Sequence, residues 1–184
     1  AGVVSMDFSA ADLDESILGT SILGDGYAYV MAADGGCVIH QLLDRDAFTG
    51  VTCHLGNGSS LAAIQDGKSV DTSMGLTPLG GIPMGTRAGD MDPAIVLHLQ
   101  NVSGLNTTEV DEILNQKSGL LGLSGISNDL REVEAAAEQG DRQAELALEV
   151  VAYQIARSIG GYLSILEGAT GIVFTGGIGE NGVP

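Results

Sequence analysis

Three glycine-rich stretches contain most of the residues that could do chemistry in this chain. They are Gly56-Asn57-Gly58, residues 119–125 and residues 176–182, and each adjoins an expected strand or opens an expected helix. Glycine and asparagine tolerate positive φ, so such turns can present consecutive backbone N–H groups without Cβ atoms in the way. Backbone N–H groups arranged in this way bind phosphate. The stretches predict a phosphate-binding site, and for Gly-Asn-Gly alone an ordinary β-hairpin turn is the alternative.

Two side chains near these stretches could act on a phosphoryl group. Arg87 lies between glycines in Gly85-Thr-Arg-Ala-Gly-Asp90. A guanidinium at such a place can stabilise charge on the oxygens of a transferring phosphoryl group. The alternative is a surface arginine paired with Asp90 or Asp92. His54 directly precedes the Gly-Asn-Gly turn, where it is either a structural histidine at a strand end or a donor to a ligand.

The last glycine stretch leaves a second kind of nucleotide open. Gly177-x-Gly179-x-x-Gly182 follows an expected strand and has the spacing of a dinucleotide-binding fingerprint. Such a fingerprint also needs a following helix and an acidic residue about 20 positions further on. The chain reaches its last residue before either could be seen, and its strands predict an antiparallel meander instead of a βαβ unit. NAD is therefore the less favoured ligand.

The composition of the chain limits the kinds of ligand and partner that it can bind. With 184 residues and 44% hydrophobic content, the chain fits one domain or one lobe of a larger protein. Seven lysines and arginines against 24 acidic residues give a formal net charge of −17. No basic stripe is present, so we expect no binding to nucleic acid. A polyanionic ligand would have to be met locally by backbone amides, a few arginines or a metal ion.

The two cysteines and the hydropathy pattern bear on location. Cys37 and Cys53 lie in apolar runs without a Cys-x-x-Cys spacing, which favours buried, reduced thiols, with a disulfide between the two as the alternative. The first residues show no signal-type region, and no window has the length of an apolar membrane span. We therefore expect a cytoplasmic protein that does not bind membranes.

The expected elements can be read in chain order. Strands over 51–55, 60–64 and 69–73 predict an antiparallel meander, and 27–31 with 37–43 predict a hairpin. Residues 74–92 predict a long functional loop. Helices are expected from Asp92-Pro93, near 107–116, from Ser127 or Asn128 to Gly140, and over 141–167, the last largely packed. Residues 118–127 predict a loop, and residues 171–175 a buried strand that leads into a glycine turn, with a further helix expected only after residue 182.

Five motifs, in order and with matching spacing over residues 51–182, resemble the acetate kinase family. They are His54-Leu-Gly-Asn-Gly58, Asp71-Thr-Ser-Met-Gly-Leu-Thr-Pro-Leu79, Met84-Gly-Thr-Arg-Ala-Gly-Asp-Met-Asp-Pro93, Ser118-Gly-Leu-Leu-Gly-Leu-Ser124 and Phe174-Thr-Gly-Gly-Ile-Gly-Glu-Asn181. The resemblance implies an α/β protein with the actin-like, Hsp70-like and sugar-kinase-like ATPase fold. In that fold a ribonuclease H-like mixed sheet has flanking helices, and two related lobes close on a nucleotide.

The resemblance also implies roles for individual residues. It gives the transition-state role to Arg87 and assigns no metal ligand. The implied nucleotide contacts are His54, Asn57 and Gly58 at the phosphates, Asp129, Leu130 and Arg131 near the nucleotide, and Gly177, Ile178, Gly179, Glu180 and Asn181 on the adenosine side.

The implied reaction is transfer of the γ-phosphoryl group of ATP to acetate, giving acetyl phosphate and ADP. It implies Mg²⁺ with the nucleotide and a homodimer in the full-length protein. Two alternatives stay open: a propionate kinase of the same family, and a nucleotide-binding fragment without catalysis.

The N-terminal residues depart from the family pattern. Residues 1–50 lack its Asn-x-Gly-Ser-Ser-Ser turn, its acetate-pocket arginine and its catalytic aspartate. Leu18-Gly-Thr-Ser21 resembles the family's His-Gly-Thr-Ser-His segment but has leucine where the functional histidine would be. The family pattern also continues beyond residue 182, with a late glutamate linked to magnesium. We expect residues 51–184 to form the nucleotide-binding lobe, incomplete at both ends, and residues 1–50 to be a remnant of the first lobe.

Overall fold

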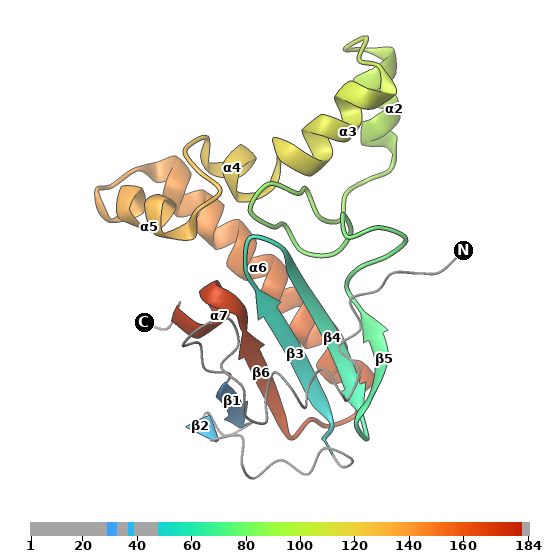
Figure 1. Cartoon of the computed structure of the whole chain (residues 1–184), viewed down its shortest axis with the longest axis vertical. Helices are drawn as coiled ribbons and strands as arrows, with labels where there is room; N and C mark the ends of the chain where they lie inside the picture. The colour runs from blue at the N-terminus through green and yellow to red at the C-terminus, as the bar shows by residue number, and fades with distance from the viewer. Residues whose placement is uncertain (1–28, 33–36, 39–47, 182–184) are drawn as a thin grey trace.

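The computed structural model describes residues 29–32, 37–38 and 48–181, and within them it contains one mixed sheet flanked by helices (Figure 1). The sheet order is β2-β1-β6-β3-β4-β5. The strands are β1 (Tyr29–Ala32), β2 (Cys37–Val38), β3 (Gly50–Leu55), β4 (Ser59–Gln65), β5 (Lys68–Thr72) and β6 (Gly171–Thr175). The helices are α2 (Ala94–Asn101), α3 (Thr107–Gln116), α4 (Gly119–Ser124), α5 (Leu130–Glu138), α6 (Arg142–Ile165) and α7 (Gly176–Asn181).

The predicted meander is confirmed. β3 pairs antiparallel with β4, and β4 pairs antiparallel with β5. Cys53 lies opposite Leu61, and both side chains are buried. Cys53 is a free cysteine, as expected, and burial raises the pKa of its thiol to about 12. The meander is therefore an apolar platform that carries the Gly56–Gly58 turn at one end.

β6 completes the centre of the sheet in a way that the meander alone does not reveal. It pairs in parallel with β3 and antiparallel with β1, although long segments separate these strands in the sequence. The predicted hairpin of residues 27–43 is confirmed as the antiparallel pair β1–β2, while its connection, residues 33–36, lies outside the described residues. Parallel pairing aligns the carboxyl ends of β3 and β6 at one edge of the sheet.

Two apolar clusters hold the helices in place. The first lies between the sheet and α6, where Val51, Leu61 and Tyr162 are buried (Figure 1). The second lies between α4, α5 and α6 around Val133 and Ala144, both 0% exposed. Small alanines on α6 let α4 and α5 approach closely. α2 and α3 extend away from the sheet at the same end as α4 (Figure 1).

Four helix predictions were wrong. Residues 119–124 form α4 instead of a loop, because the carbonyls of Met84 and Gly85 accept the amides of Leu120 and Leu121 at the start of the helix. α5 has Asp129 as its N-cap, whose carboxylate accepts from Arg131 N, and Ser127 instead accepts from Asp129 N. Residues 176–181 already form a helix, α7, whereas a helix was predicted only after residue 182.

The fourth wrong prediction is that the helix over residues 141–167, α6, is largely packed. The helix begins at an N-cap, Asp141, and its buried residues are Ala144, Ala147 and Tyr162. Tyr153 is 66% exposed, and Leu146 is 50% exposed. The apolar residues are spread around the helix, whereas the sheet and the α4–α5 pair cover only part of its circumference. Helical spacing alone did not reveal which of its faces are covered.

No helix in the described part of the chain is both long and apolar enough to cross a membrane.

Candidate functional site

Residues 84–88 of the long loop are fixed by backbone hydrogen bonds to three separate elements. A loop without regular structure can be this rigid only if its own N–H and C=O groups find partners. The bonds are Gly85 N to Asn57 O (3.0 Å), Ala88 N to Leu114 O (2.9 Å) and Leu120 N to Met84 O (2.8 Å). The 84–88 segment therefore joins the β3–β4 turn, α3 and α4 into one unit, and it carries Arg87 into that unit.

Gly85 allows the loop to approach the β3–β4 turn closely. A Cβ at Gly85 would lie 2.0 Å from Asn57 Oδ1 and 3.0 Å from its Cγ. No real side chain can share that space, so the backbone of Gly85 is the surface against which the Asn57 carboxamide rests. The sequence identified this glycine only as part of a flexible-looking loop, but it is needed for close contact.

Arg87 lies beside the β3–β4 turn. Its Nη1 donates to Pro78 O at 3.5 Å, and this nitrogen lies 3.5 Å from where a Cβ would be on Gly58. The alternative of a surface pair is not seen in the described residues. Asp90 instead accepts from Gly81 N at 2.7 Å, and Asp92 accepts from Ala94 N at 2.9 Å. Within the described residues, the half-buried guanidinium therefore sits against a backbone turn and forms no ion pair with a carboxylate.

His54 connects the ends of the two parallel strands. Its Nδ1 lies 3.0 Å from Oγ1 of Thr175, the last residue of β6. Gly176 has φ of +80°, and a Cβ on it would lie 2.6 Å from Leu55 O and 3.2 Å from the His54 ring. This junction needs glycine for both conformation and space. His54 thus packs between the β3–β4 turn and the start of α7.

A cavity of about 660 Å³ opens at this edge of the sheet. A cavity of this size is in the range of small-molecule and cofactor sites. Its wall comes from the β3–β4 turn, from the segment around the start of α5, and from α7. The lining residues are Gly56, Asn57, Asn128, Asp129, Leu130, Arg131, Glu134, Gly177 and Ile178.

The cavity brings together segments that the sequence analysis singled out separately. Asn57, the 129–131 segment and Gly177–Ile178 all line it. Gly179 is buried next to Phe174 and Cys53 and does not line it. Gly58, Arg87 and His54 also lie outside its lining. The side chains of Glu180 and Asn181 are outside the described residues.

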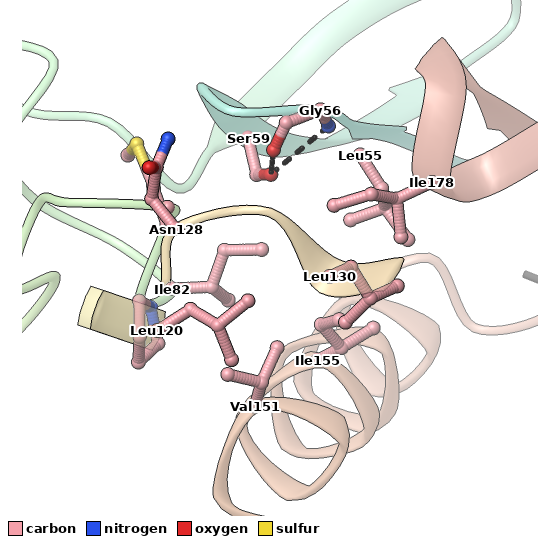
Figure 2. Close-up of a pocket in the computed structure, with 13 residues that line it drawn as sticks. Leu55, Gly56, Ser59, Ile82, Leu120, Asn128, Leu130, Val151, Ile155 and Ile178 are labelled. Atoms are coloured by element: carbon pink, nitrogen blue, oxygen red, sulfur yellow. Dashed lines mark hydrogen bonds between the residues drawn. The ribbon is translucent and has the colours of Figure 1, made fainter. Parts of the chain in front are cut away.

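A second, smaller cavity of about 30 Å³ adjoins the first, and Figure 2 shows the residues that line it. Its lining is almost wholly apolar and includes Ile82, Leu120, Val151 and Ile155. Gly56, Asn128, Leu130 and Ile178 line both cavities. In Figure 2 the Ser59 hydroxyl donates to Gly56 O at 2.9 Å, which fixes the near end of the β3–β4 turn. The two cavities therefore share part of their walls, and the smaller one has the more apolar lining.

One ion pair shapes the electrostatics of the large cavity. The Asp129 carboxylate accepts from Arg131 Nε at 3.0 Å and also from Arg131 N at 3.0 Å. These hydrogen bonds and the guanidinium charge lower the pKa of Asp129 to about 2. The pair faces solvent, since the Arg131 side chain is 86% exposed. A ligand could therefore recruit the guanidinium at little structural cost, while Asp129 continues to cap α5.

Sequence reasoning missed two polar residues of the lining. Asn128 was considered only as a helix cap, yet its Nδ2 donates to Asn57 Oδ1 at 2.9 Å across 71 positions of sequence. Glu134 lines the cavity from α5, where an exposed helix carboxylate carries no local signal of a site. The only sequence signal for Asn128 was its position directly before Asp129, the first residue of the segment expected near the nucleotide.

The described residues do not form a Mg²⁺ site by themselves. They contain no group of three or more His, Cys, Asp or Glu side chains that could hold a metal ion. Mg²⁺ in nucleotide sites is usually held by phosphates, waters and one or two carboxylates. The described side chains therefore fit Mg²⁺ only if the ion enters bound to a nucleotide, and we assign no residue as a Mg²⁺ ligand.

The mixed sheet, the helices and the cavity at the carboxyl ends of β3 and β6 define one lobe of the actin-like, Hsp70-like and sugar-kinase-like ATPase fold. The structure is similar to that of the acetate kinase of Porphyromonas gingivalis, with a TM-score of 0.74 and 46% identity over 76% of this chain and 35% of that one. It is also similar to a propionate kinase from Francisella tularensis, with a TM-score of 0.71 and 47% identity over 73% of this chain and 35% of that one.

Comparison of the sequence with known families identifies the family to which the chain belongs. The profile of the Acetokinase family matches residues 23–184, so the chain belongs to that family. It is 59% identical to the acetate kinase of Methanosarcina barkeri over 131 residues, which are 71% of this chain and 32% of that protein. It is 48% identical to an acetate kinase of Clostridium botulinum over 160 residues, 86% of this chain and 39% of that protein. The chain thus spans about a third of the length of the curated relatives it matches.

Gly85→Ala tests the close approach of the 84–88 segment to the β3–β4 turn. Because the new Cβ overlaps Asn57 Oδ1, the free energy of unfolding should fall by about 1–3 kcal/mol. Urea denaturation measures the change. Gly75→Ala is the matched control in the same loop, since nothing lies within 4 Å of a Cβ there, and it should stay within about 0.5 kcal/mol. Equal stability of the two variants would contradict the contact.

The Asp129–Arg131 pair predicts a pH response. Asp129 should titrate near pH 2 when followed by NMR, and Arg131→Ala should move its pKa up toward the ordinary value near 3.8. A lowered pKa means that the contribution to α5 is present above about pH 4 and is lost as the pH falls toward 2. Arg142→Ala, which removes a different exposed arginine, should leave the Asp129 titration unchanged. An unshifted Asp129 in the unsubstituted protein would refute the pairing.

Proposed function

We propose that this chain is the nucleotide-binding lobe of an acetate kinase, which transfers the γ-phosphoryl group of ATP to acetate and gives acetyl phosphate and ADP. The observation that carries the proposal is the cavity of about 660 Å³, in which Asn57, the 129–131 segment and Gly177–Ile178 meet. These segments are far apart in the sequence and belong to motifs shared with the family. Their convergence on one cavity is what a nucleotide site requires.

The residues divide the nucleotide between them in this proposal. The β3–β4 turn, with Asn57 and Gly58, offers donors to the phosphates from a backbone free of bulky side chains. Gly177 and Ile178, which line the cavity, face the adenosine side. For Gly179, Glu180 and Asn181 this role rests on the family likeness alone. Arg131 and Leu130 lie between the β3–β4 turn and Gly177–Ile178, where the exposed guanidinium can exchange its partner Asp129 for a phosphate or ribose oxygen.

Arg87 and His54 serve the phosphoryl group that is transferred. Arg87 lies beside Gly58, in the turn whose Gly56 and Asn57 line the cavity. A γ-phosphoryl group that extends past this turn would meet the guanidinium, which can stabilise charge on its equatorial oxygens. His54, held by Thr175, supports the turn from beneath and donates toward the phosphates. Catalysis in this scheme is positioning and charge neutralisation.

Several finer parts of the proposal rest on the family likeness. Mg²⁺ enters with the nucleotide and offsets phosphate charge, which matters in a chain with a formal net charge of −17. The full-length protein works as a cytoplasmic homodimer. Residues 51–184 form the nucleotide-binding lobe, to whose sheet residues 29–32 and 37–38 add two strands. The rest of residues 1–50, most of which lies outside the described residues, derives from the first lobe.

Propionate is the second candidate acceptor, because the propionate kinase of F. tularensis is about as similar in structure as the acetate kinase of P. gingivalis. A coupled ADP-release assay with acetate, propionate and butyrate, on the longest protein that contains this chain, distinguishes the two. A fragment that binds nucleotide without catalysis would show binding and no turnover with any of the three acids.

Isothermal titration of the chain with MgATP, MgADP and NAD tests the nucleotide assignment. We expect the two adenine nucleotides to bind and NAD to bind weakly or not at all, because the cavity is built from the meander turn and not from a βαβ phosphate loop. Tight binding of NAD without binding of ATP would overturn the proposal.

Arg87→Ala should lower kcat far more than it raises the KM for ATP in the complete enzyme. An arginine on the transferring phosphoryl group acts mainly in the transition state, where its loss can cost about 10³-fold. Arg87→Lys should recover little, since an ammonium lacks the planar fork. Arg142→Ala, an exposed arginine paired with Glu145, is the matched control and should leave kcat near normal. Steady-state kinetics decide, and a normal kcat for Arg87→Ala would leave Arg87 as scaffold.

A further inference from the structure

The side chain of Asn128 makes a polar contact that its own segment does not require. Its Nδ2 donates to Asn57 Oδ1 at 2.9 Å, and both residues line the large cavity. Asn128 stands one residue before the cap of α5, and Asp129 alone caps that helix through its carboxylate. The Asn128 carboxamide is therefore not needed to cap α5, and it forms a hydrogen bond to Asn57 in the β3–β4 turn.

Both ends of this contact are fixed by other bonds. On one side, Ser127 Oγ accepts from Asp129 N at 3.1 Å, and Ser124, which is buried, donates its hydroxyl to Ser127 O at 3.4 Å. On the other side, Asn57 O accepts from Gly85 N at 3.0 Å. Neither backbone is free to drift, so the link between the two carboxamides has a defined geometry.

The contact determines which end of the Asn57 carboxamide faces the cavity. A primary amide has an acceptor oxygen on one side and two N–H donors on the other. Asn57 Oδ1 is engaged by Asn128 and lies against the backbone of Gly85, where a Cβ would be 2.0 Å away. Nδ2 is then the atom left for a ligand. With the amide reversed, the oxygen would face the ligand and repel a phosphate.

We propose that Asn128 is a positioning residue that holds the Asn57 carboxamide with its Nδ2 donors directed at a phosphate group of the nucleotide. The inference rests on the proposed function, because it assumes that a nucleotide occupies the large cavity. Asn128 affects phosphate binding only through its hydrogen bond to Asn57. It also ties the start of α5 to the β3–β4 turn, so the orientation of the donor depends on how the helical part sits on the sheet.

A simple latch between the two segments is the competing explanation, and an isosteric substitution separates the two. Asn128→Asp can still bond to Asn57, but only by accepting from Nδ2, which turns the Asn57 oxygen toward the ligand. A latch predicts that Asn128→Asp is close to the unsubstituted protein and that Asn128→Ala is worse. Positioning predicts the opposite order, with Asn128→Asp the weaker binder of nucleotide.

The test is titration of the chain with MgADP and with adenosine, which lacks phosphate. Asn128→Ala should weaken MgADP binding about three- to tenfold, the usual value of one hydrogen bond, and leave adenosine binding unchanged. Combined with Asn57→Ala it should cause no further loss, since its effect passes through Asn57. Asn128→Asp in the Asn57→Ala background measures the effect of the added charge alone. Asn115→Ala, which removes an exposed asparagine paired with Asp111 on α3, is the matched control.

Each outcome decides a different point. Equal losses for MgADP and adenosine, or additive losses with Asn57→Ala, would overturn positioning in favour of a structural role. Unchanged MgADP binding in Asn128→Ala would overturn any role in the site. Failure of the unsubstituted chain to bind MgADP would instead reject the proposed function, and this inference with it.

Discussion

The site depends on one constraint: the backbone of residues 84–88 must satisfy its hydrogen bonds against three elements at once. It bonds to the β3–β4 turn, to α3 and to α4. A loop packed in this way has no regular partner strand, so each amide and carbonyl needs a specific acceptor or donor elsewhere. Gly85 makes the approach to Asn57 sterically feasible. These bonds attach the loop that carries Arg87 to the β3–β4 turn, α3 and α4.

The net charge of the chain limits how the proposed site can attract an anion. A formal net charge of −17 repels phosphate at long range, so attraction has to be local. In the proposed site, backbone amides, the Asn57 carboxamide and two arginines supply it. Of the two acidic residues that line the cavity, Asp129 and Glu134, Asp129 is already engaged in other bonds. Asp129 caps α5 and pairs with Arg131, and Asp90 accepts from the Gly81 amide.

Sequence reasoning succeeded where the signal is local. The β3–β4–β5 meander follows from β-branched and apolar runs separated by Gly-Asn-Gly and Asp-Gly turns, and the structure contains it. It failed where a partner far along the chain decides the outcome. α4 forms because carbonyls of the 84–88 segment accept its first amides, and the exposure of Tyr153 on α6 depends on which faces the sheet reaches. Neither partner is visible within a local window.

The sequence by itself determined the strands, the glycine turns and the residue types that could meet a phosphate, because these depend on local φ preferences and side-chain chemistry. Only the tertiary structure decided which of them share a cavity. Parallel pairing of β3 with β6 aligns two strand ends, and the fold of α5 onto α6 brings Asn128 to Asn57. Such contacts join residues separated by long stretches of chain, and the free energy that selects them comes from burying the apolar core as a whole.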